Sequence, residues 1–354
     1  MDATTVDGPA VGDPARLYRV NVVADSAAEW GGRLTTFRVQ FPRVLLAELN
    51  THRVLTRSVE SSRAVPVGRR LAAVRDNPYL PQQWLASAKG MQAGPPLEVY
   101  ERGEAWAAWL LARDAAARQA ERLSQLGVAK EEANRLLEPF ALVKAVVTGT
   151  QWHNFFALRT HADAYPPFRL LARAMYLAYC RSVPTPLGRG EWHLPFITGA
   201  DRAAAAEYCA GKPAAAGPVP VFPRAVPAPD WPTYHLCRWS AARSARVSYG
   251  RVDGTPTSYD HDDETWAKLV GDADPWRPPA RPAPDAAARP MHASPLEHQA
   301  CPDPGGAWGG NLGPGWLQFR KLFRHERCDR FTPAAGDAAA WAEEVPADVF
   351  RADW

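Results

Sequence analysis

The chain has 354 residues, of which 46% are hydrophobic, enough to bury the core of one large domain or two ordinary ones. Its formal net charge of +3 excludes the strong basic field that drives non-specific binding to nucleic acids or anionic membranes. No apolar run approaches the ~20 residues needed to span a bilayer, and the five cysteines include no C-x-x-C pair. We therefore expect a soluble cytoplasmic protein without a disulfide framework.

The N-terminal region combines a tail with a hairpin. Residues 1–16 are rich in Asp, Pro and Gly without an apolar core, which predicts a loose, disordered tail rather than a signal peptide. Two short runs with β-branched residues in partial alternation, 17–24 and 34–39, flank a Gly-Gly turn signal. They predict two strands joined as a hairpin.

The middle of the chain is expected to be largely helical. Apolar side chains recur there at helical spacing, and Asp163 followed by Pro166 and Pro167 is typical of a helix start. Residues 78–96, rich in Pro, Gln and Gly, predict an extended surface segment. The predicted helices cover residues 44–49, 106–127, 130–139, 143–156, 163–178 and 236–245.

The C-terminal half contains two Ala/Pro-rich segments, 203–232 and 272–290, with too few large apolar side chains to pack. We expect both to be insertions in a single domain that covers residues 17–332. The acidic, Ala-rich segment 333–354 predicts a partly helical tail.

Three polar clusters could carry chemistry. Residues 50–63 pack arginine, histidine and hydroxyl side chains directly after an apolar helix, which suits a phosphate; a polar loop with incidental salt bridges is the alternative. Residues 151–161 interleave aromatic rings with amides, His and Arg, which suits a flat heterocycle, or a core helix whose rings simply pack. In the third cluster, His292 and His298 lie six positions apart around a proline, unlike the i, i+4 pair of helical zinc motifs, so no metal site is expected.

Together these clusters resemble the flavin-dependent thymidylate synthases. Residues 36–63 are similar to that family's strand and helix leading into R-H-R, followed by a Ser and an Arg, and residues 292–298 resemble its H-x-[ST]-P-F-E-H element. Residues 243–249 are similar to its R-x-A-R-V-S-[FY] element, and 132–139 with 154–159 match two helical elements of its C-terminal half. In the family, the R-V-S and H-x-[ST]-P-F-E-H elements precede R-H-R, so this chain looks circularly permuted.

The resemblance implies an α+β fold, with an antiparallel sheet packed with helices and the motif order permuted. It implies conversion of dUMP to dTMP, with FAD as cofactor and with NADPH and methylenetetrahydrofolate as co-substrates. It also implies a homotetramer whose active sites are shared between subunits. No nucleic acid, membrane or metal is implied as a partner.

The resemblance also assigns roles to individual residues. Arg159 and Ser61 are the catalytic candidates, and the nucleotide would be bound by Ser61, Arg63, Arg135 and Arg159. FAD would be contacted by His52, Arg53 and Asn154, in a pocket that a neighbouring subunit lines with Ser248, His292 and Ser294. Glu297 and His298 are expected to anchor the turn that carries them.

Some family residues are replaced in this chain. A carboxylate at Glu48 would repel phosphate unless it is paired, and Arg57 is the expected partner. The replacements leave two alternatives open: the same chemistry on UMP or a cytidine nucleotide such as dCMP, or a non-catalytic nucleotide-binding homologue. The replacing residues are Glu48 for Gln, Thr51 for the first Arg of R-H-R, Thr148 for Asn, and Tyr165 and Pro167 for Gln and Glu.

Overall fold

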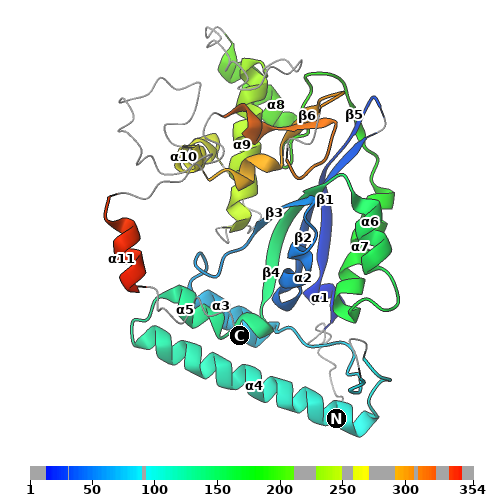
Figure 1. Ribbon diagram of the computed structural model, residues 1–354, viewed down its shortest axis with the longest axis vertical. Helices are drawn as coiled ribbons and strands as arrows, with labels where there is room; N and C mark the ends of the chain where they lie inside the picture. The colour runs from blue at the N-terminus through cyan, green and yellow to red at the C-terminus, as the bar shows by residue number, and fades with distance from the viewer. Residues whose placement is uncertain are drawn as a thin grey trace, which may run out of the picture.

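The computed structural model describes residues 13–30, 32–89, 93–210, 229–248, 258–270, 292–306, 310–323 and 335–344. At its centre lies a five-stranded sheet with the strand order β3-β4-β2-β1-β5 (Figure 1). Neighbouring strands are antiparallel except for the parallel pair β1–β5. The expected α+β fold with an antiparallel sheet is therefore confirmed. The strands are β1 (Arg19–Ala28), β2 (Arg33–Pro42), β3 (Leu55–Val59), β4 (Leu142–Gly149) and β5 (Thr185–Leu187).

The predicted hairpin is confirmed as β1 and β2, although β1 begins at Arg19 rather than at residue 17, and both strands continue past their predicted C-terminal ends. Alternate residues of a strand point to opposite faces of the sheet. On β2, Phe37, Val39 and Phe41 are buried on one face, whereas Arg38 and Gln40 lie on the other. The two faces of the sheet therefore differ sharply in polarity.

Two helices, α6 (Trp152–Arg159) and α7 (Pro166–Arg181), cover the apolar face of the sheet (Figure 1). The helix predicted over residues 163–178 is confirmed as α7, and its apolar side chains Phe168, Leu171 and Met175 are fully buried. The helix begins at Pro166 with Tyr165 as its N-cap, rather than at Asp163. Proline at the first helical position has its φ preset for the helix, which explains this start.

The predicted helix over residues 143–156 is wrong. This segment forms β4 as far as Gly149, and α6 begins only at Trp152. Strand β4 lies between β2 and β3, and four of its apolar residues are completely buried. A strand that is buried on both faces appears in the sequence as a continuous apolar run, which periodicity cannot distinguish from a buried helix.

The remaining N-terminal helices gather at one end of the sheet (Figure 1). The expected tail 1–16 must be shortened, because Asp13 caps a helix that includes Arg16, and Arg16 pairs with Asp76 at 2.9 Å. Residues 1–12 lie outside the described part of the chain. These helices are α1 (Pro14–Leu17), α2 (Leu46–Asn50), α3 (Val67–Asp76), α4 (Val99–Gln125) and α5 (Lys130–Arg135).

The C-terminal half builds a second apolar core around α9, which packs against β3 and β4. The predicted insertion 203–232 is partly wrong, because α8 extends through Cys209 and buries Ala205. A capping box between Thr198 and Asp201 starts this helix. Most of the two predicted insertions, 211–228 and 272–290, lies outside the described residues. The elements are α8 (Gly199–Cys209), α9 (Trp231–Ser248), α10 (Tyr259–Val270), the 3-10 turn η4 (Ser294–Glu297), β6 (Ala300–Pro302), β7 (Trp316–Gln318) and α11 (Asp337–Glu344).

In the parts of the chain that the structure describes, no helix combines the length and apolar character needed to cross a membrane.

Candidate active site

Arg159, the last residue of α6, is held by three side chains at the C-terminal end of α2. Its Nε donates a hydrogen bond to Nε2 of His52 at 2.9 Å, and its Nη1 lies 3.0 Å from Oε2 of Glu48. Its Nη2 donates to Oγ1 of Thr51 at 3.3 Å. Two of the replaced family positions, Glu48 and Thr51, therefore meet at the Arg159 guanidinium.

The expected pairing of Glu48 with Arg57 is wrong. Arg57 instead donates to the main-chain carbonyls of Leu49 and His52, which fixes the turn after α2. Glu48 is neutralised by Arg159, whose side chain is only 22% exposed. The Glu48 carboxylate therefore orients the Arg159 guanidinium and is not an unpaired negative charge.

Aromatic rings support this cluster. The Arg159 guanidinium lies over the Phe168 ring, 4.8 Å from its centroid, and His52 contacts Phe155 edge to face at 4.9 Å. Burial lowers the pKa of His52 to about 4, and the charges of Arg159 and Arg57 lower it in the same direction. His52 is therefore neutral at pH 7, and because its Nε2 accepts from Arg159, its proton resides on Nδ1.

The phosphate candidates lie on two adjoining segments. Ser61 and Arg63 lie on the loop between β3 and α3, and Arg135 is the last residue of α5. The Asn134 side chain joins the segments by donating to main-chain carbonyls of that loop at 2.8 and 2.9 Å. Arg63 and Arg135 are exposed, and within the described residues no contact links either of them to Arg159.

Among the flavin candidates, Arg53, Asn154 and His292 are exposed, and Ser294 is half-buried. Arg53 follows His52 in the turn after α2, and Asn154 lies on the exposed side of α6. On η4, the hydroxyl of Ser294 lies 3.2 Å from Nε2 of His292. The side chain of Ser248 lies outside the described residues. Within one chain, the flavin candidates near α2 and α6 are therefore separate from those at η4.

The turn η4 is anchored to the sheet as expected. His298 places Nδ1 2.8 Å from Oγ1 of Thr148 and Nε2 3.0 Å from Oγ of Ser58, while Glu297 accepts from Thr56 at 3.0 Å and pairs with Arg320. The two later segments of the sequence therefore pack directly on the sheet built by the earlier ones. The permuted order remains a prediction.

The first arginine of the R-x-A-R-V-S element, Arg243, is part of a buried ion network. It contacts both carboxylate oxygens of Asp201, at 2.8 and 2.9 Å, and Oδ2 of Asp262 at 2.8 Å. Burial raises the pKa of Asp201, but hydrogen bonds from Arg243 and Thr198 outweigh it and lower the pKa to about 2. This arginine joins α8, α9 and α10 to one another.

Sequence reasoning missed the ring of Phe168 as part of the site, because it was assigned only to the buried face of the predicted helix 163–178, whereas Phe155 lay within the aromatic cluster 151–161. A residue whose ring packs in the core on one side and contacts a polar cluster on the other has the same periodicity as an ordinary core residue. No sequence signal distinguishes the two cases.

Residues 34–185 match the family model described as thymidylate synthase complementing protein. No curated protein matches the chain. Among solved structures, the UMP/dUMP methylase PolB from Streptomyces cacaoi, bound with 5-Br UMP, is 19% identical with a TM-score of 0.40, over 46% of this chain and 89% of that one. Thymidylate synthase X from Helicobacter pylori, with FAD and dUMP, is 18% identical with a TM-score of 0.29, over 41% and 67%. The family resemblance expected from the motifs is confirmed by the family model.

Proposed function

We propose, on the premise that residues 34–185 belong to the thymidylate synthase complementing protein family, that the chain methylates dUMP to dTMP. FAD is the proposed cofactor, methylenetetrahydrofolate the carbon donor and NADPH the reductant. The observation that carries the proposal is the Arg159 cluster, which lies within the matched segment.

The geometry of Arg159 suits a pyrimidine ring. A guanidinium has five N–H donors, and contacts with Glu48, Thr51 and His52 use three of them. Two donors remain for carbonyl oxygens of a bound uracil. Because the group is already oriented and largely removed from water, it can stabilise negative charge that develops on those oxygens.

The residues around this cluster fit FAD. The Nδ1 proton of His52, the guanidinium of Arg53 and the amide of Asn154 are donors suited to carbonyl, phosphate and ring-nitrogen acceptors. When bound and reduced, FAD supplies the hydride that no side chain can supply. Thr51 provides one fewer cation than the family arginine would.

The phosphate would be bound by Ser61, Arg63 and Arg135. The exposure of Arg63 and Arg135, and the lack of a contact from either of them to Arg159 within the described residues, support a site that neighbouring subunits of a homotetramer complete. His292, Ser294 and Ser248 would come from such a neighbour.

The alternatives concern the nucleotide and the flavin. Turnover of dUMP, UMP and dCMP by the purified, FAD-loaded protein distinguishes them, and we expect dUMP to be converted fastest. Faster conversion of UMP or dCMP would identify that nucleotide, rather than dUMP, as the substrate. Inactivity on all three by a folded, flavin-loaded protein would contradict a catalytic role and favour the non-catalytic homologue.

A further inference from the structure

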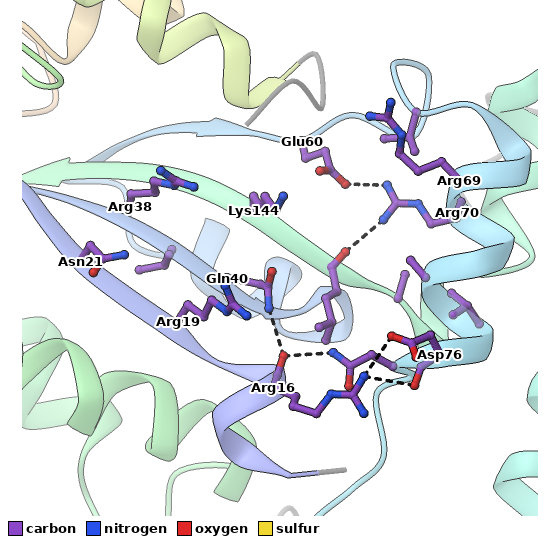
Figure 2. A pocket seen from close by; sticks show the side chains of 17 residues that line it. Arg16, Arg19, Asn21, Arg38, Gln40, Glu60, Arg69, Arg70, Asp76 and Lys144 are labelled. Carbon is purple, nitrogen blue, oxygen red and sulfur yellow. Dashed lines mark hydrogen bonds and ion pairs between the residues drawn. The ribbon is translucent and has the colours of Figure 1, made fainter. Parts of the chain in front are cut away.

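A groove lies on the polar face of the sheet (Figure 2). It lies between strands β1, β2 and β4 and helix α3, and its volume is about 760 Å³. Glu60 and Asp76 are the acidic residues of the lining. The cationic residues that line it are Arg16, Arg19, Arg38, Arg69, Arg70 and Lys144. The lining therefore carries an excess of four positive charges.

Strand alternation and register produce this concentration of charge. Arg19 pairs across the sheet with Gln40, which pairs in turn with Lys144, and in the next row Asn21 pairs with Arg38. Residues directly or diagonally opposite on neighbouring strands share one face of the sheet. Figure 2 shows these five side chains together on that face.

The acids of the lining do not balance these charges. Asp76 is paired with Arg16 at 2.9 Å, and Glu60 is paired with Arg70 at 2.7 Å. Partial burial lowers the pKa of Arg38, and the nearby charge of Arg19 lowers it further. Like charges on adjacent strands destabilise a sheet, so an anion between Arg19 and Arg38 would relieve this repulsion.

We propose that this groove is a binding site for a small polyanion, a ligand that carries two or more phosphate or carboxylate groups. Guanidinium groups bind both kinds of anion through paired hydrogen bonds, and the amide of Asn21 adds polar contacts beside them. The groove has the volume of ordinary small-molecule sites. The groove borders the loop that carries Ser61 and Arg63, since Glu60 and Val65 line it, but no residue of the proposed active site lines it itself, so its lining is a separate set of residues.

Calorimetric titration of the full chain at fixed ionic strength tests this site. Tripolyphosphate is the phosphate probe and triglutamate the carboxylate probe; the one that binds more tightly identifies the source of the anionic groups. The double variant Arg19→Gln/Arg38→Gln should bind that probe at least about tenfold more weakly, the contribution of one charge-assisted hydrogen bond. Arg118→Gln, at an exposed arginine of α4 outside the groove, should bind like the wild type.

Thermal denaturation provides a second readout that does not use enzymatic activity. The tighter probe should raise the Tm of the wild type and of Arg118→Gln, and raise that of the double variant much less. Circular dichroism verifies that the double variant is folded. Binding of neither probe by folded wild type, or equal binding by the wild type and the double variant, would overturn the proposal.

Discussion

Arg159 is the residue on which the proposed chemistry depends most. Replacing it by alanine removes the oriented cation and leaves Glu48 without its partner. Turnover of dUMP should fall by about two to three orders of magnitude, the usual effect of losing a group that stabilises transition-state charge. Subunit assembly, measured by light scattering, should not change. Near-normal turnover of Arg159→Ala would refute the assignment.

Arg63 should act on binding rather than on turnover. Its exposed guanidinium forms no ion pair within the described residues, so removal should leave the fold intact. Arg63→Ala should weaken dUMP binding by about 1.5 to 3 kcal/mol, the contribution of a charge-assisted hydrogen bond. Titration with dUMP measures this, with Arg118→Gln as the matched control. An unchanged dissociation constant would show that the phosphate lies elsewhere.

At the residue scale, the motifs identified the residue types but not their partners. The segment around His52 and the segment ending at Arg159 were both selected from the sequence, whereas the pairing of Glu48 with Arg159 was not. That pairing depends on how α2 and α6 approach each other, which local sequence does not determine. Arg57 was the nearer cation along the chain, but its guanidinium is bound to main-chain carbonyls.

At the scale of elements, Arg243 holds three helices together through two buried carboxylates. Arg243→Met should leave Asp201 and Asp262, which are 5% and 0% exposed, without their main partner. Breaking a buried ion pair from one side costs about 3 to 5 kcal/mol. The urea midpoint should therefore fall strongly relative to that of Arg118→Gln. A midpoint equal to that of the control would contradict a structural role for this arginine.

Periodicity predicted the hairpin and α7, which each bury one face, whereas β4 was predicted as helix because both of its faces are buried from Ala145 to Thr148. Helix α8 was assigned to an insertion because its alanines resemble low complexity, although its capping box and the buried Ala205 support it. Composition does not reveal such a tertiary contact.

At the scale of the whole molecule, a buried chain of hydrogen bonds crosses the sheet and joins it to later segments. Each link is 2.7 to 3.0 Å long. Thr148, which stands where the family has Asn, is its central member and bonds to both Thr36 and His298. The members are Ser26, His193, Thr36, Thr148, His298 and Ser58.

This chain of hydrogen bonds should make stability depend on pH. Burial lowers the pKa values of His193 and His298 to about 3, so the folded protein keeps both neutral while the unfolded chain binds protons near 6.5. Their contribution to stability is complete above pH ~6.5 and is lost as pH falls towards 3, by up to about 1.4 kcal/mol per pH unit per histidine. The urea midpoint should therefore be lower at pH 5 than at pH 7. Equal midpoints would contradict this account.

The central claim is that the chain uses FAD to methylate a pyrimidine nucleotide, and the visible absorption spectrum of the purified chain after reconstitution with FAD tests it most directly. We predict a yellow protein that retains flavin absorbance after gel filtration, with a spectrum that changes when dUMP is added, because His52 and Arg159 connect the proposed flavin and nucleotide positions. A folded protein that stays colourless after reconstitution would contradict the claim.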